Sequence, residues 1–360
     1  MNMKKTKKLK SSQIFLVVAL VVCIVFASLF LVKLITKSNS IENKLFRMGY
    51  SDEDIAIIAN LSDESKSLLL ENYEEKNSNI LHNSFFEEEN LDLYLKYYGQ
   101  SDLDDDTLFK VINNGYVREY GLDVVQGIFT DPFYIENNKD KYFKYSDRFE
   151  TYREVVEYVN VQRYDEYYTN VKPTDLSKGY LILLNKYNYL EEDYVPDLVA
   201  VSGYYGVGYM REEPYEAYAL MYEDALKEGY DIRVVSPYRM WSTQYRLYYG
   251  YMENDPQEVV DTYSARPGYS EHQTGLAIDV SIPGCSLDDF IYTDASDWLK
   301  EHCYEYGFII RYPEGKDDIT GYQYEPWHIR YVGTDASSII KETGITFDEY
   351  YAYYIENNTN

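Results

Sequence analysis

The stretch that most limits how this chain can fold is GLAIDVSI, residues 275–282. Its aliphatic residues alternate with small or polar ones, which is typical of a β-strand with one face on a hydrophobic core. The aliphatic positions are Leu276, Ile278, Val280 and Ile282. Asp279 therefore faces the opposite side, where its small neighbours leave room around the carboxylate. His272 precedes the strand on a loop with Gly268 and Gly275, so we expect an imidazole beside the carboxylate.

A second alternating stretch, YQYEPWHIRYVG over residues 322–333, also predicts a strand. Glu325 and His328 are three positions apart, and regular alternation would place them on opposite faces. Pro326 lies between them and cannot donate a hydrogen bond to a neighbouring strand. We therefore expect a bend at this proline that aims both side chains into one cleft.

Helices and short strands are interleaved between residues 172 and 345. The segment REEPYEAYALMYEDALKEG predicts a helix, and after Gly229 a β-branched strand ends at Ser236. A second helix, TDASDWLKEHCYEYG, ends at Gly307 and precedes the strand FIIRY. We therefore predict an α+β domain over residues 172–345.

The beginning of the chain combines a basic tail with a long apolar run. Residues 1–13 contain five lysines, and residues 14–32 contain no charged residue. At about 1.5 Å per residue, this run nearly spans a hydrocarbon core of about 30 Å. We predict a transmembrane helix over residues 14–35, with the basic tail cytoplasmic and residues 38–360 extracellular, as in a single-pass protein of the cell membrane. A cleaved signal peptide is the less favoured alternative, because no A-x-A site follows the run.

The remainder of the chain is strongly acidic. The whole sequence has 61 acidic and 34 basic residues, and the first 37 residues hold seven lysines and no acid. Phosphate binding needs a basic surface, so we predict no nucleic-acid partner. Residues 38–171 are expected to form a mostly helical spacer of unknown role, and residues 346–360 a C-terminal tail. Two spacer segments, LYLKYYGQSDLDDDTLFKVINNG and YFKYSDRFETYREVVEYVN, share aromatic openings, but their similarity is too weak to predict a repeat.

His272, Asp279 and His328 together make a set of two imidazoles and one carboxylate, which suits Zn²⁺. Three protein ligands leave a fourth position for water, which is the arrangement of catalytic zinc sites. Glu325 would then be the spare acid that takes the proton of that water. From these residues alone, a buried core histidine and a hydrogen-bonded strand aspartate explain the pattern equally well.

Four segments of the chain match a set of known motifs in the same order. SEHQTGLAID, residues 270–279, matches S-x-H-x-x-G-x-A-x-D, and EPWHIRYVG, residues 325–333, matches E-x-W-H-x-R-[YF]-V. SPYRMWSTQ, residues 236–244, matches S-x-Y-R-x-x-x-x-Q, and LLNKYNYLEEDYVPDLVAV, residues 183–201, matches an entrance segment. In these motifs the chain resembles the zinc D-alanyl-D-alanine carboxypeptidases of the VanY type, including related L,D-carboxypeptidases. The resemblance covers about residues 180–335 and leaves residues 38–170 outside.

The resemblance implies a fold and a role for each matching residue. The fold would be a small antiparallel sheet flanked by helices, as in Hedgehog signalling domains and D-Ala-D-Ala peptidases. One Zn²⁺ per chain would be held by His272, Asp279 and His328. Glu325 would be the general base and then the acid that protonates the leaving amine, and Arg239 would stabilise the oxyanion. The other motif residues would bind the substrate, namely Tyr238, Gln244, Ser270 and Trp327.

Two functions are compatible with these features. The first is a membrane-anchored zinc peptidase that removes the C-terminal D-alanine from peptidoglycan stem peptides, by cutting either a D,D or an L,D bond. The second is a non-catalytic, zinc-containing module that binds or senses wall peptides. A binding-only domain needs neither a base at Glu325 nor an oxyanion group at Arg239, so their presence favours the enzyme.

Overall fold

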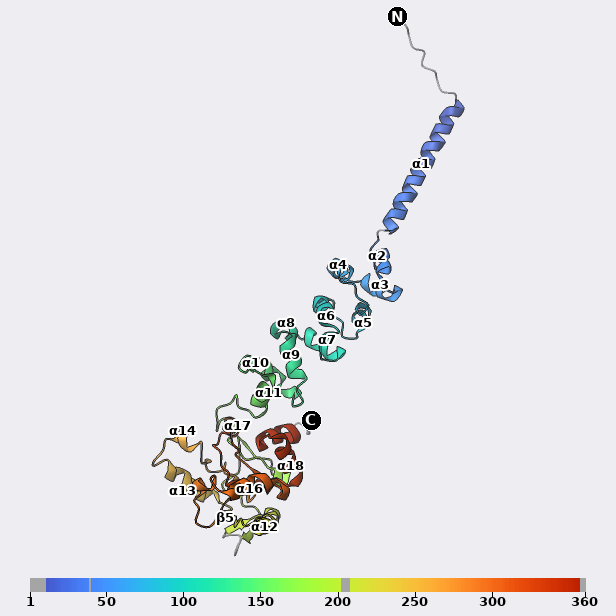
Figure 1. Cartoon of the computed structure of the whole chain (residues 1–360). Helices are drawn as coiled ribbons and strands as arrows, with labels where there is room; N and C mark the ends of the chain where they lie inside the picture. The colour runs from blue at the N-terminus through green and yellow to red at the C-terminus, as the bar shows by residue number, and fades with distance from the viewer. Residues whose placement is uncertain (1–10, 39, 202–207, 357–360) are drawn as a thin grey trace. The chain divides into compact units, whose positions relative to one another are not determined.

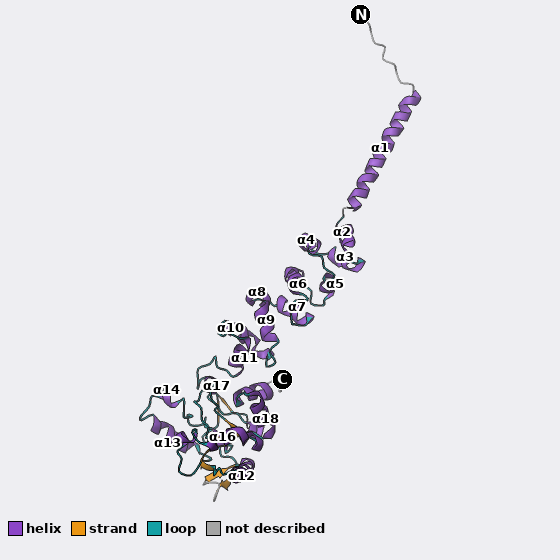
Figure 2. Ribbon diagram, in the orientation of Figure 1, coloured by secondary structure: helices purple, strands orange, loops and turns teal. Residues whose placement is uncertain are grey.

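The computed structural model describes residues 11–38, 40–201 and 208–356, without the side chains of residues 11–17 and 34–38. The chain divides into two compact units, Met1–Thr130 (unit 1) and Asp131–Asn360 (unit 2). Among the described residues, strands occur only in unit 2 (Figure 2). Residues 1–10 of the predicted basic tail and residues 357–360 of the predicted C-terminal tail lie outside the described residues.

The predicted transmembrane span falls on α1 (Ser11–Ser38), the long helix next to the N-terminus in Figure 1. Its large apolar side chains between Val18 and Val32 are exposed. The side chains at both ends of the span, residues 14–17 and 34–35, are not described. Within the described part of the chain, no helix combines the length and the apolar character needed to cross a membrane. The structure therefore does not support the span, which stays a prediction.

Beyond α1, unit 1 is a succession of short helices, some of which are capped by a side chain at the N-terminus. Ser51 accepts a hydrogen bond from the Asp54 amide at 3.1 Å, and the Asp54 carboxylate accepts one from the Ser51 amide at 2.9 Å. This reciprocal cap begins α3. The bounds are α2 Ile41–Met48, α3 Asp52–Ile58, α4 Asp63–Glu71, α5 Asn77–His82, α6 Leu91–Tyr97, α7 Asp105–Asn113, α8 Tyr116–Tyr120 and α9 Leu122–Phe129.

One asparagine ties α6 and α7 to the loop before them. The side-chain oxygen of Asn113, the last residue of α7, accepts hydrogen bonds from the Tyr94 hydroxyl and, at 3.2 Å, from the Asn90 amide. Its own amide donates to the Phe85 carbonyl at 2.8 Å. A single side chain thus satisfies three polar groups, one in α6 and two in the segment before it.

Unit 2 begins with a second copy of the same arrangement, in α10 (Lys139–Tyr145) and α11 (Tyr152–Asn160). The oxygen of Asn160 accepts from the Tyr142 hydroxyl and, at 3.0 Å, from the Asn138 amide. The amide of Asn160 donates to the Phe133 carbonyl at 2.9 Å. The two spacer segments are therefore a structural repeat, which their sequence similarity alone did not predict. The repeated hydrogen bonds involve only a few side chains, and the surrounding positions have diverged.

The centre of unit 2 is a four-stranded antiparallel sheet in the order β5-β6-β8-β7. The strands are β5 Arg233–Ser236, β6 Ala277–Ser281, β7 Phe308–Ile310 and β8 His328–Tyr331. Each of them lies in a segment that the sequence predicts to be a strand. The mixed helix and sheet architecture is therefore the predicted one.

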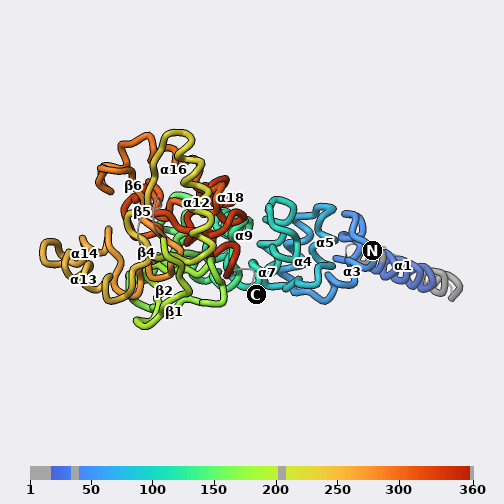
Figure 3. The backbone as a smooth tube through the Cα atoms, turned by 90° about the horizontal axis from the view of Figure 1, so that it is seen from below, coloured from blue at the N-terminus to red at the C-terminus, as the bar shows by residue number. Residues whose placement is uncertain are grey.

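The two faces of this sheet have different partners. On one face, Ile278, Val280 and Ile329 pack with buried residues of α12 (Glu212–Lys227) and α16 (Asp294–His302). These two helices lie beside β5 and β6 in Figure 3. Because side chains alternate along a strand, Asp279 and His328 are directed to the other face.

Other helices of unit 2 complete this second side. Ile309 and Val332 form a second core with α18 (Thr334–Thr343) and α19 (Phe347–Tyr350). Residues 347–356, in the predicted C-terminal tail, are helical, and most of their side chains are buried. The remaining elements are β1 Lys172–Pro173, β2 Asn188–Tyr189, β3 Val199–Val201, β4 Gly208–Met210, α13 Trp241–Tyr251, α14 Gln257–Val260, α15 Leu287–Phe290 and α17 Asp317–Thr320, with short 3-10 turns and a final π-helical turn, Tyr351–Glu356.

Candidate active site

The pairing of β6 with β8 brings an aspartate and a histidine face to face. Asp279 and His328 are register partners in this antiparallel pair. The Asp279 Oδ1 atom lies 3.0 Å from the Nδ1 atom of His328. Both side chains are buried, at 6% and 4% exposure, so their polar atoms depend on each other and on neighbouring protein groups.

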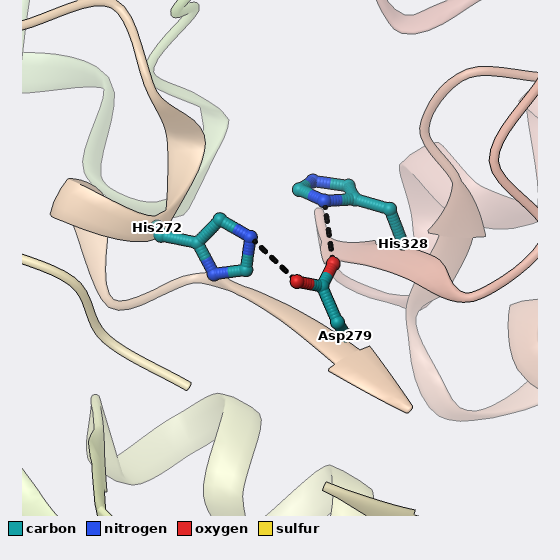
Figure 4. A group of neighbouring side chains, drawn as sticks. All are labelled: His272, Asp279 and His328. Carbon is teal, nitrogen blue, oxygen red and sulfur yellow. Dashed lines mark hydrogen bonds and ion pairs between the residues drawn. The ribbon is translucent and has the colours of Figure 1, made fainter. Parts of the chain in front are cut away.

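His272 completes the group from the 3-10 turn Glu271–Thr274 that leads into β6. Gly275 ends this turn at a φ of 68°, a left-handed conformation that favours glycine. The Nε2 atom of His272 lies 3.2 Å from Asp279 Oδ2 (Figure 4). Its Nδ1 atom lies 2.9 Å from the Pro237 carbonyl. One ligand atom from each of the three residues lies within 4.8 Å of the others, the only such group found among the described residues.

Glu325 and Arg239 reach the same group from two other segments. The Glu325 carboxylate lies 3.9 Å from His328 Nδ1, because the backbone turns at Pro326 and the His328 amide bonds the Glu325 carbonyl. Arg239 follows β5, and its guanidinium lies 3.6 Å from the Asp279 carboxylate. The bend that the proline predicts is therefore present.

These groups line a cavity of about 240 Å³. Ser270, Gln244 and Trp327 also line it, as the substrate-binding prediction requires. Tyr238 is absent from the described lining residues, and its hydroxyl is buried without a hydrogen-bond partner there. Of the nine predicted site residues, Tyr238 is thus the one that the structure does not bring to the cavity.

Gln244 also binds neighbouring groups of the protein. Its side-chain oxygen accepts a hydrogen bond from Arg239 at 2.8 Å, and its amide donates to the Ala265 carbonyl at 2.7 Å. The other arm of the Arg239 guanidinium donates to Ser236 Oγ at 2.6 Å. In this state Gln244 and Ser236 hold the guanidinium in place.

The titratable groups of the cavity are strongly perturbed. Burial raises the pKa of Glu325 to about 8, with Asp279 adding to the rise and His328 opposing it. Burial alone would lower the pKa of His328, but its contacts with Asp279 and Glu271 raise it to about 9. Burial lowers the pKa of His272, while the two histidines hold that of Asp279 well below its usual range against the effect of burial. Perturbed groups of this kind gather at functional sites.

Sequence reasoning missed the charged residues behind the cavity. Glu271 lines the cavity and is bound by Arg330 and Arg311 at 2.7 and 2.8 Å. A signal for Arg330 existed, because it lies two residues after His328 and alternation directs both to one face. No local pattern distinguished Glu271 from the exposed glutamates of this acidic chain.

Comparison with known proteins identifies the family. The VanY family model, described as D-alanyl-D-alanine carboxypeptidase, matches residues 208–334. The YodJ protein of Bacillus subtilis (strain 168) is 37% identical over 202 residues, which cover 52% of this chain and 74% of YodJ. The chain belongs to the VanY family of D-alanyl-D-alanine carboxypeptidases. It is accordingly a hydrolase of the metallo-carboxypeptidase class.

Two further proteins are similar to this chain. The bifunctional D-Ala-D-Ala dipeptidase and D-Ala-D-Ala carboxypeptidase VanXYC of Enterococcus gallinarum is 43% identical over 128 residues, covering 34% of this chain and 67% of VanXYC. The solved structure of the LdcB LD-carboxypeptidase is similar with a TM-score of 0.48 and 36% identity, covering 51% of this chain and 91% of LdcB.

Proposed function

We propose that this protein is a zinc-dependent carboxypeptidase that removes the C-terminal D-alanine from peptidoglycan stem peptides. The observation that carries the proposal is the buried group of His272, Asp279 and His328, with Glu325 and Arg239 in the same cavity. Membership of the VanY family supports the reaction class. A module that only binds wall peptides would have no need of a buried acid and a held guanidinium beside the ligand group.

The residues present fit a zinc ion. Two imidazole nitrogens and a carboxylate oxygen are a donor set that zinc prefers, and all three residues are buried where a cation can replace the lost hydration. The backbone carbonyl of Pro237 faces His272 Nδ1, which favours a proton there and leaves Nε2 free as a ligand. When bound, zinc would polarise the scissile carbonyl and lower the pKa of a water molecule to about 7.

Glu325 would move the proton in this reaction. It lines the same cavity without belonging to the ligand group, and its carboxylate is 3.9 Å from His328. Burial raises the pKa of Glu325 to about 8, which is suited to a group that first accepts a proton and then gives it to the leaving amine. A dication held by its neighbours would lower this pKa and favour the carboxylate that accepts the proton.

Arg239 would stabilise the negative charge that develops on the carbonyl oxygen. Its guanidinium is held by Gln244 and Ser236 before substrate arrives, so little reorganisation is needed. Replacing it with lysine would keep the charge but lose the two-sided hold. We expect Arg239→Lys to lower kcat by about 10²–10³-fold.

The test is mass spectrometry of pentapeptide and tetrapeptide stems incubated with the zinc-loaded protein. Loss of one alanine from the pentapeptide would indicate D,D-carboxypeptidase activity, and loss from the tetrapeptide would indicate L,D-carboxypeptidase activity. Glu325→Gln should lower the rate by about 10²–10⁴-fold, because it removes the general base without changing the size of the side chain. The matched control is Glu314→Gln, at an exposed carboxylate, which should leave the rate unchanged. Zinc binding without alanine release from either stem would favour the non-catalytic module.

We also propose that residues 14–35 anchor the protein in the cell membrane with unit 2 outside the cell. The support is the uncharged run of residues 14–32 and the five lysines that precede it. Protease added to intact cells should then digest unit 2, and residues 38–360 produced alone should leave the membrane fraction. A full-length chain that stays in the soluble fraction would count against the anchor.

A further inference from the structure

Four charged side chains form a closed cluster directly behind the ligand histidine His328. The members are Glu271, Arg311, Arg330 and Asp348, none of them more than 5% exposed. They come from the turn before β6, from the residue after β7, from β8 and from α19. Two charges of each sign are therefore buried together, so that the attraction between them compensates for their lost hydration.

The hydrogen bonds of this cluster use only one of the two carboxylate oxygens of Glu271. Glu271 Oε1 accepts from Arg311 Nε at 2.8 Å and from Arg330 Nη1 at 2.7 Å. Arg311 also donates to Asp348 at 2.7 Å, and Arg330 donates to the Ile182 carbonyl at 2.6 Å. Two guanidinium groups thus hold Oε1 in place and restrict the orientation of the carboxylate.

The other oxygen faces the metal-site histidine. Glu271 Oε2 lies 3.7 Å from His328 Nε2. Within the described residues, both atoms are buried and neither has a hydrogen-bond partner. The opposite nitrogen of the same ring, Nδ1, faces Asp279. Buried polar groups are normally hydrogen-bonded, and this distance is only slightly too long for a hydrogen bond. A small movement of the His328 ring on binding a metal would bring the two atoms into hydrogen-bond distance.

We propose that Glu271 is a positioning residue, which keeps the proton of His328 on Nε2 so that the Nδ1 lone pair points into the metal site. A ligand histidine must carry its proton on the nitrogen that does not bind the metal, and a carboxylate behind that nitrogen favours this tautomer. The Pro237 carbonyl has the same role for His272, because it faces the Nδ1 atom of that ring and favours a proton there. This inference rests on the metal site of the proposed function.

The two arginines explain why a carboxylate can stand there. Arg330 and Arg311 bind Glu271 at 2.7 and 2.8 Å, so its negative charge is compensated within the cluster. Asp348 in turn balances the second guanidinium. The helix α19, in the predicted C-terminal tail, thus contributes to the support of a ligand on β8.

Zinc affinity of two matched variants of the full chain tests this role. In Glu271→Gln the amide oxygen can still accept from the arginines, which turns the NH₂ group towards His328 Nε2 and favours the wrong tautomer. We expect the zinc dissociation constant, measured by competition with a chelator, to rise about 10–100-fold. Asp348→Asn removes a charge from the same cluster without facing His328, and should change the constant less than about threefold.

A second measurement needs no substitution. In the zinc-loaded, unsubstituted chain, ¹⁵N NMR of the histidine rings should show that His328 carries its proton on Nε2. A proton on Nδ1, equal losses of affinity in the two variants, or no loss in Glu271→Gln would each overturn the inference. If the unsubstituted chain bound no zinc, the proposed function would fail together with the inference. If it bound zinc and released alanine while Glu271→Gln bound zinc equally well, only the inference would fail.

Discussion

His328 is the residue at which protonation and metal binding compete. Its two ring nitrogens face the carboxylates of Asp279 and Glu271, at 3.0 and 3.7 Å. These neighbours raise its pKa to about 9 against the effect of burial, so in the absence of metal it is a cation at neutral pH. A protonated Nδ1 has no lone pair for a metal, and zinc must displace that proton.

This competition predicts a pH dependence of zinc affinity. Below about pH 8, binding should release one proton from His328 and a second from Glu325, whose pKa is raised to about 8 by burial. The apparent dissociation constant should therefore fall about 10- to 100-fold for each unit of rising pH, and level off above about pH 9. Chelator competition between pH 6 and 10 measures it. Glu325→Gln should show the shallower, tenfold slope, whereas an affinity independent of pH below 8 would contradict the assignment.

At the scale of single residues, the sequence predicted the residues of the cavity better than the charged residues behind them. The motifs named the three residues of the buried group and Glu325, because each lies in a strand or turn with a local pattern. Glu271 sits between two predicted site residues and was still missed. Its role depends on Arg311 and Arg330, which lie 40 and 59 positions away and reach it only through the sheet. Gln244 shows the same limit, since its contact with Arg239 depends on the packing of α13.

At the scale of elements, the repeat in α6–α7 and α10–α11 predicts that equivalent asparagines contribute equally to the stability of their units. Asn160→Ala would leave the hydroxyl proton of the buried Tyr142 without its acceptor, and would remove the Asn160 partner of the Phe133 carbonyl and of the Asn138 side-chain amide. We expect a loss of about 2–3 kcal/mol in the free energy of unfolding of unit 2.

The equivalent change in unit 1 is Asn113→Ala, and its cost to that unit should agree within about 1 kcal/mol if the two copies are one motif. Amide hydrogen exchange over residues 83–113 and 131–160 resolves the two units. The exposed neighbours provide matched controls, because Asn114→Ala and Asn137→Ala should each change stability by less than about 0.5 kcal/mol. Equal effects of Asn160→Ala and Asn137→Ala would disprove the repeat.

The elements differ in how far local patterns predict them. The alternation in residues 275–282 predicts β6 correctly, because one face of this strand packs on a core of aliphatic side chains. In contrast, α19 spans only four residues, too few for a helical period to appear in the sequence. Phe347 and Asp348 are buried there by contacts with distant segments of unit 2, such as the Arg311 side chain.

At the scale of the whole molecule, the helices before residue 172 are divided between the two units. Residues 131–171 belong with the catalytic part in unit 2. The ring of Phe133 stacks on that of Tyr353 with centroids 3.9 Å apart. Tyr168, at a φ of 62°, donates its amide to the Lys186 carbonyl and stacks under the guanidinium of Arg266. A non-glycine residue in this conformation persists only where packing holds it.

These contacts predict where the chain can be cut. The fragment 131–360 should keep the thermal unfolding transition of unit 2 and a carboxypeptidase rate within about twofold of the full chain, because no contact within unit 2 is lost. The fragment 172–360 starts at the predicted domain boundary and loses the Phe133 and Tyr168 rings.

Removing a fully buried aromatic side chain typically costs about 3–5 kcal/mol, and Phe133 and Tyr168, which are partly buried, should each cost less than this. Since a domain of this size is stable by only about 5–15 kcal/mol, we expect fragment 172–360 to unfold at a much lower temperature or to aggregate. Calorimetry of both fragments, with alanine release as a second readout, makes the comparison. Phe133→Ala in the fragment 131–360 separates the effect of the ring from that of chain length, and should account for part of the loss. If fragments 131–360 and 172–360 melt at the same temperature, residues 131–171 contribute nothing to the stability of the catalytic fold. The packing of Phe133 and Tyr168 against it would then not stabilise it.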